Sequence, residues 1–180
     1  KVTGELQITS GVQATGVVTA TSFVGSGALL TDLPASGKPT NLVINGAMRL
    51  AQRGTYSAGE GYKTVDRFQY YKSGTNETPN QSQVDVASGT PAYQAGFRKA
   101  YQIQNGNQTS AGGGDLVFIE QNIEARNIRN SGWNYTDSNS KITLSFWVKS
   151  SVAQNFYGQL VSTDGTSQNY PFETGTLTAN

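Results

Sequence analysis

The stretch VVTATSFVGSGALLTDLP, residues 17–34, constrains the fold of this chain more than any other part of the sequence. It is too apolar to lie in water, too rich in glycine and threonine to favour a helix, and too short to build a core of its own. Its apolar side chains fall on both faces of an extended strand, and such a strand needs cover on both faces. As a monomer it would expose open apolar edges, which promote aggregation. We therefore expect other copies of the chain to bury it.

A threefold bundle would bury this stretch, because each apolar side chain can meet its symmetry mates around the axis. Gly25 and Gly27 would let the three backbones turn in close quarters. We predict that residues 1–33 form a trimerising, intertwined β-stalk and that residues 34–40, PASGKPT, form a linker. The residues expected at the trimer interface are Val17, Val18, Phe23, Val24, Leu29, Leu30 and Leu33.

Residues 41–180 are predicted to form an all-β head domain. Short runs of alternating or continuous apolar residues are separated by clusters of turn-forming residues, a spacing typical of an antiparallel β-sandwich or jelly roll. The segment EARNIRN predicts one short helical turn, and the final TGTLTAN resembles an unfinished strand, so we expect the jelly roll to be incomplete at its C-terminal end. The predicted strands cover residues 67–72, 83–86, 97–103, 116–124, 141–149 and 156–161.

The chain contains no histidine and no cysteine. Their absence removes Ser-His-Asp and Cys-His catalysis, the usual zinc, haem and iron–sulfur ligands, and disulfides, and it predicts no cofactor. Charged residues make up 14% of the chain and the net charge is +1, so neither nucleic acid nor an anionic membrane is an expected partner. The longest apolar run falls far short of the roughly 20 residues that span a bilayer.

Carboxylate chemistry and oxygen-ligated calcium need neither histidine nor cysteine. Glycoside hydrolysis requires two carboxylates about 5–10 Å apart, whereas Glu120 and Glu124 would be separated by about 13 Å along a regular strand. Distances between the other acidic residues do not follow from the sequence, so a hydrolase stays an alternative. The loops DSNS and STDG carry Asp and Asn, but neither completes a calcium-binding loop, and we predict no metal site.

Four motifs, in this order, carry a resemblance to a known family: NLVINGAMRLAQRG, YKTVDRF, FIEQNIE and ITLSFWVKS. They come after TATSFVGSGALLTDL, which is similar to a repeat that stands ahead of the C-terminal globular part in such proteins, except that Asp32 replaces its usual glycine. Together they resemble tail-fibre and related virion proteins of bacteriophages, especially marine and cyanobacterial ones, over most of residues 12–160. The resemblance implies a trimeric appendage whose distal jelly roll is similar to carbohydrate-binding modules, and it implies no catalytic site.

Sugar binding by a β-sandwich uses flat aromatic faces together with planar amides or carboxylates. Side chains alternate along ITLSFWVK, so Ile142, Leu144, Phe146 and Val148 are expected in the core, with Trp147 on the opposite, polar face. Alternatively, Trp133 and Tyr135 plug the edge of the sandwich, and Trp147 contacts a loop or a neighbouring chain. The candidate glycan-binding residues are Trp147, Trp133, Tyr135, Gln121 and Glu124.

Asp66 and Arg67 are adjacent in VDRF and would point to opposite faces of a strand, so we do not expect them to pair with each other. We predict instead that Asp66 pairs with Arg49 or Arg53 and that this contact pins the start of the head domain.

The leading hypothesis is a non-enzymatic structural protein of a virion fibre, located on the virion, whose head mediates attachment to host-surface glycan or docks the fibre. Its expected partners are two further copies of the chain, other tail or capsid proteins, and host polysaccharide. Two alternatives stay open. One is a polysaccharide depolymerase that uses paired carboxylates, and the other is a purely structural adaptor that binds other virion proteins.

Overall fold

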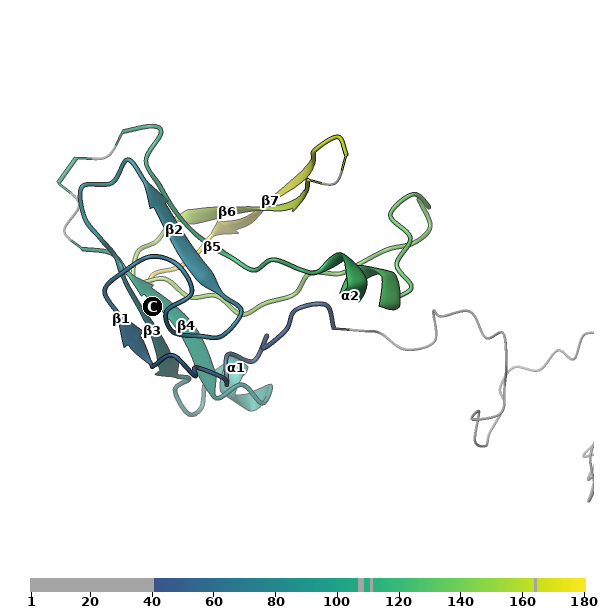
Figure 1. Cartoon of the computed structure of the whole chain (residues 1–180). Helices are drawn as coiled ribbons and strands as arrows, with labels where there is room; N and C mark the ends of the chain where they lie inside the picture. The colour runs from purple at the N-terminus through teal and green to yellow at the C-terminus, as the bar shows by residue number, and fades with distance from the viewer. Residues whose placement is uncertain (1–40, 107–108, 111, 164) are drawn as a thin grey trace, which may run out of the picture. The chain divides into compact units, whose positions relative to one another are not determined.

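The computed structural model describes residues 41–106, 109–110, 112–163 and 165–180 (Figure 1). All of them belong to the predicted head. The predicted stalk, the predicted linker and all seven predicted trimer-interface residues lie outside these described residues.

Strands dominate the head, which confirms the β-rich class. Every predicted strand except residues 141–149 overlaps a strand of the structure, and EARNIRN contains the helix α2. The sequence prediction missed β1 and α1, and it reached only the C-terminal end of β7 through TGTLTAN. In chain order the elements are β1 (Tyr56–Ser57), β2 (Gln69–Ser73), β3 (Asn80–Asp85), α1 (Pro91–Gln94), β4 (Lys99–Gln104), β5 (Leu116–Glu120), α2 (Ala125–Asn130), β6 (Asn155–Ser162) and β7 (Gln168–Thr176).

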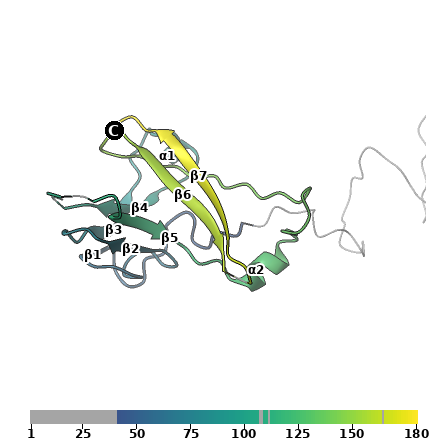
Figure 2. The ribbon, with the colours of Figure 1, turned by 90° about the horizontal axis from the view of Figure 1, so that it is seen from above.

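The strands form three small antiparallel groups rather than one continuous sheet. The first has the order β1-β3-β4, the second pairs β2 with β5, and the third is the β6–β7 hairpin. Figures 1 and 2 show the long β6–β7 hairpin as a layer distinct from β1, β3 and β4. The all-β class is therefore established for the head, whereas the closed sandwich stays a prediction.

A small core joins the first two groups. Val65, Phe68 and Tyr70 are 1%, 8% and 0% exposed, and the Tyr70 hydroxyl donates a hydrogen bond to the Pro79 carbonyl at 2.6 Å. The Phe68 ring packs against Tyr101 of β4 with ring centroids 6.2 Å apart. These contacts hold β2 and the preceding loop against β3 and β4.

Gln81 of β3 is a polar residue at the centre of this core, with 0% exposure. Its Oε1 accepts hydrogen bonds from the Thr64 and Tyr101 hydroxyls, both at 3.0 Å. Its Nε2 donates to the carbonyls of Gly59 and Gly61. A buried amide is stable only when its donors and acceptors are paired, and the pairing here ties the loop of residues 59–64 to the sheet.

The pKa values of the two core tyrosines are raised above the ordinary value for tyrosine. Burial raises the pKa of Tyr70, and the nearby Glu60 carboxylate raises it further. Burial also raises the pKa of Tyr101, with Tyr70 adding to the shift. Both hydroxyls therefore remain available as hydrogen-bond donors in the core.

Residues 141–149 differ from the prediction. They form no strand, and their backbone makes no backbone hydrogen bond to any described residue. The side chains expected in the core are exposed, from 40% for Ile142 to 53% for Phe146. Alternation favours a strand, but a strand also needs a partner edge, and the described part of the head offers none here.

One contact does attach this segment to the β6–β7 hairpin. The Phe146 ring lies 6.1 Å from the ring of Phe172 in β7. Phe172 in turn covers Gly158, its cross-strand partner in β6, where an added Cβ would lie 2.3 Å from the ring. Gly158 therefore leaves the space that the Phe172 ring occupies.

Candidate ligand-binding pocket

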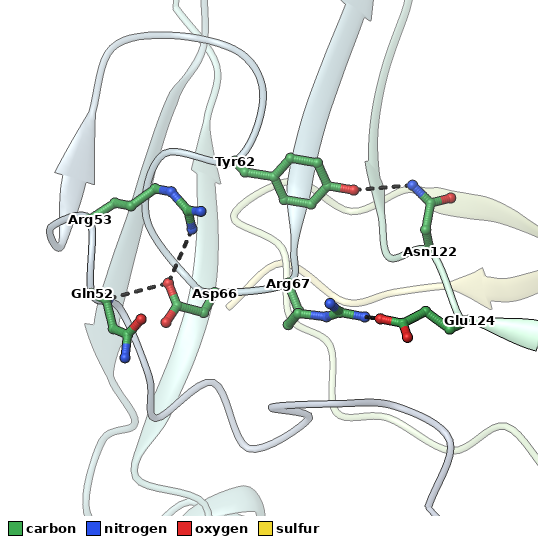
Figure 3. Close-up of a pocket in the computed structure, with 7 residues that line it drawn as sticks. All are labelled: Gln52, Arg53, Tyr62, Asp66, Arg67, Asn122 and Glu124. Atoms are coloured by element: carbon green, nitrogen blue, oxygen red, sulfur yellow. Dashed lines mark hydrogen bonds and ion pairs between the residues drawn. The ribbon is translucent and has the colours of Figure 1, made fainter. Parts of the chain in front are cut away.

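A polar cavity of about 480 Å³ lies beside the small core. Figure 3 shows that three segments far apart in the sequence supply its walls: the loop after residue 50, the turn that leads into β2, and the segment between β5 and α2. Its lining residues are Gln52, Arg53, Tyr62, Asp66, Arg67, Asn122 and Glu124.

Asn45 holds the first two segments together. Its Nδ2 donates to the carbonyls of Leu50 at 2.9 Å and Asp66 at 3.0 Å, and its Oδ1 accepts from the Leu50 amide at 3.0 Å. The Asp66 amide also donates to the Leu50 carbonyl at 2.9 Å. The backbone of Asn45 has φ 57°, a left-handed conformation that asparagine tolerates better than most residues. The motif around Asn45 thus sets one wall of the pocket.

Asp66 lines the pocket next to Gln52 and Arg53 and contacts both of them. Its Oδ1 accepts from the Gln52 backbone amide at 3.2 Å and pairs with Arg53 Nη1 at 3.5 Å. The Asp66 side chain is 13% exposed, whereas that of Arg53 is 60% exposed. The prediction that Asp66 pairs with Arg49 or Arg53 is confirmed for Arg53, and Asp66 does not pair with Arg67.

Arg67 contacts Glu124, which belongs to the segment between β5 and α2. Arg67 lies in a turn before β2 rather than in a strand, and its φ of 75° is unusual for a residue other than glycine. The predicted strand therefore begins two residues too early, because the hydrogen bonds of this turn bend the backbone there. The Arg67 Nη2 donates to Glu124 Oε1 at 2.7 Å, and both side chains remain partly exposed.

Tyr62 and Asn122 close the third side. The Asn122 Nδ2 donates to the Tyr62 hydroxyl at 3.1 Å across a sequence distance of 60 residues. Tyr62 is 37% exposed, and its ring lies along the pocket in Figure 3. The pocket therefore combines one accessible aromatic ring with two side-chain amides, two carboxylates and two guanidinium groups.

Two of the predicted glycan-binding residues lie in this region. Glu124 lines the pocket. Gln121 instead binds backbone, since its Oε1 accepts from the Ile44 amide at 2.9 Å and its Nε2 donates to the Ile44 carbonyl at 2.8 Å. The predicted regular strand through Glu124 ends at Glu120, so the separation expected between the two glutamates does not apply.

The predicted aromatic residues lie outside the pocket lining. Trp133 packs edge-on against Tyr135 with ring centroids 6.4 Å apart, and its Nε1 donates to the Ser140 carbonyl at 3.3 Å. Tyr135 is 77% exposed, and Trp147 is 56% exposed in the unpaired segment. Trp147 makes no ring contact with a described aromatic residue.

Comparison with known proteins identifies no relative: no known family, no curated protein and no solved structure matches this chain. The likeness to virion fibres therefore rests on the sequence motifs alone.

Of the lining residues, the sequence prediction named only Glu124 as a ligand candidate. It missed Gln52, Tyr62 and Asn122, and it gave Arg53, Asp66 and Arg67 only a structural part. All of these residues lie within the motifs that carry the fibre resemblance. Polar residues of those motifs were therefore the signal in the sequence that could have pointed to the pocket.

Two further observations bear on the chemistry open to the head. The described residues contain no group of three or more acidic side chains placed to hold a metal ion. Among the helices of the described part, none has the length and apolarity to cross a membrane.

Proposed function

We propose that this chain is a non-enzymatic segment of a virion fibre whose head attaches the particle to host-surface glycan, and that the polar pocket is the attachment site. The observation that carries the proposal is the lining of the pocket, which pairs the Tyr62 ring with amide, carboxylate and guanidinium groups. Sugars have apolar ring faces that stack on an aromatic ring and hydroxyls that exchange hydrogen bonds with planar polar groups. The order of the fibre-like motifs supports the same proposal.

A glycan array of bacterial surface polysaccharides tests the pocket as the attachment site. Tyr62→Ala removes the stacking ring, and we expect apparent affinity for the best-bound glycan to fall about tenfold, the equivalent of about 1.4 kcal/mol. Tyr135→Ala is the matched control, because Tyr135 is an exposed tyrosine outside the pocket lining. Equal losses in both variants, or a loss only in Trp147→Ala, would contradict the assignment.

The trimeric stalk belongs to the same proposal and is supported by the apolar pattern of residues 17–34. Native mass measurement of the chain should give three times the single-chain mass of 19.2 kDa. We expect a single trimeric species, because only neighbouring copies can cover a strand that is apolar on both faces. A stable monomer at micromolar concentration would refute the stalk.

A second candidate function is docking to other virion proteins, and the exposed segment of residues 141–149 favours it. Residues 141–149 have no backbone hydrogen bond to a described residue and expose apolar side chains, and such a segment is suited to pairing with a strand of a partner. Binding to a virion protein, with no binding to any glycan on the array, would support this adaptor function. Release of reducing ends from an array polysaccharide would instead support the depolymerase.

A further inference from the structure

The two arginines of the pocket have more hydrogen-bond donors than the described residues use. A guanidinium group carries five N–H donors. Arg53 makes one contact, at 3.5 Å to Asp66, and Arg67 makes one contact, at 2.7 Å to Glu124. Neither contact is a two-pronged pair, which is the arrangement that arginine and carboxylate prefer. The lining of the pocket therefore carries guanidinium N–H donors that no described residue uses.

Hydrogen bonds and buried neighbours hold the backbone around Arg67, and this sets where its side chain leaves the backbone. Arg67 lies between Val65 and Phe68, both buried in the core, and its φ is 75°. The preceding residue, Asp66, is held by its backbone hydrogen bonds to Asn45 and Leu50. A left-handed backbone at a residue other than glycine or asparagine costs free energy and persists only where its surroundings impose it.

The partner of Arg67 is replaceable. The side chains of Arg67 and Glu124 are 39% and 57% exposed, and exposed ion pairs contribute little to stability. Glu124 stands at the N-cap of α2 yet makes no capping hydrogen bond with its side chain. Its carboxylate can therefore swing away from Arg67 without the loss of a helix cap.

We infer that the pocket selects an acidic saccharide, one whose carboxylate takes the place of Glu124 on Arg67 while its ring lies against Tyr62. This inference rests on the proposed function and adds the class of ligand. The sugar carboxylate would accept two parallel N–H donors from Arg67, with Arg53 supplying a further positive charge. Its hydroxyls would meet the free Oδ1 of Asn122 and the Asp66 carboxylate.

Matched pairs of oligosaccharides test the inference by titration at fixed salt. Each pair shares length and linkage and differs only at C6: oligoglucuronate against oligoglucose, and oligogalacturonate against oligogalactose. We expect the wild-type chain to bind at least one acidic member roughly tenfold more tightly than its neutral counterpart.

Two substitutions locate the effect. Arg67→Asn should reduce acidic-sugar affinity about tenfold while leaving thermal stability intact, because asparagine tolerates the left-handed backbone. Glu124→Gln should raise that affinity roughly threefold to tenfold, because it removes the competing carboxylate. Arg129→Gln is the matched control, because it changes the net charge by the same amount as Arg67→Asn. Arg129 is an exposed arginine in the last turn of α2 and lies outside the pocket lining.

The possible failures are distinct. Equal binding of acidic and neutral members would overturn the acidic selectivity and leave glycan attachment standing. No binding to any saccharide on the array would overturn both. Equal weakening by Arg129→Gln and Arg67→Asn would show general charge attraction and would overturn the assignment to Arg67.

Discussion

Replacing Gln81 with alanine is expected to lower the free energy of unfolding of the head by about 3–4 kcal/mol. The substitution removes an amide with 0% exposure that pairs two hydroxyls and two carbonyls. Those partners would stay buried with nothing to bind, and each unpaired buried group carries a desolvation cost of about 1–3 kcal/mol that relaxation and water entry offset in part. Urea denaturation followed by tryptophan fluorescence measures the loss.

Two further variants show whether the loss comes from hydrogen bonding. Gln102→Ala makes the same chemical change on the exposed face of β4 and should cost at most about 0.5 kcal/mol. Gln81→Leu keeps most of the side-chain volume but leaves the hydroxyls of Thr64 and Tyr101 without their acceptor. If Gln81→Leu proves as stable as the wild type, the buried amide is not what ties the loop to the sheet.

Replacing Asn45 with alanine should have the second largest effect, a loss of about 2–4 kcal/mol together with loss of glycan binding. The side chain makes three hydrogen bonds to backbone groups of Leu50 and Asp66, and each contributes about 0.5–1.5 kcal/mol. Alanine must also adopt φ 57°, which costs about 1–2 kcal/mol. Thermal unfolding and titration with the array ligand measure the two consequences.

Asn45→Gly separates these two causes. Glycine adopts the left-handed backbone without strain, so it should lose the hydrogen bonds but recover about 1 kcal/mol relative to alanine. Both variants should weaken glycan binding, since both release the wall that carries Asp66. Unchanged binding in either variant would contradict the role of Asn45 in shaping the pocket.

Local pattern was sufficient to predict most strands of the head. The alternation in FRKAYQI and the apolar run in LVFIE predicted β4 and β5, because side-chain period and β-branched composition act within a few residues. The helix α1 carried a readable signal that the prediction did not use. Thr90 caps it by accepting from the Tyr93 amide, and Pro91 occupies its first turn.

The sequence pattern gave the wrong prediction where secondary structure or burial depends on a distant partner residue. The alternation of residues 141–149 is the most regular in the chain, yet the described residues supply no edge to pair with it. Gln81 shows the opposite error, in which a residue that looks exposed is buried. A glutamine in NQSQVD is not expected in the core unless the hydrogen bonds from Thr64 and Tyr101 are known.

The candidate site was predictable only in part. Adjacent charges in VDRF predicted the Asp66–Arg53 pair, and Glu124 was named as a ligand candidate. The pocket itself depends on contacts such as that between Tyr62 and Asn122, which joins segments 60 residues apart. Contacts of this kind follow from the tertiary arrangement and not from local spacing.

A crystal structure of the chain with the best-bound array glycan tests most directly whether the pocket is the attachment site. We predict the sugar in the cavity of about 480 Å³, with its ring against Tyr62. A glycan stacked on Trp147 or Trp133 instead, with the pocket unoccupied, would contradict that assignment.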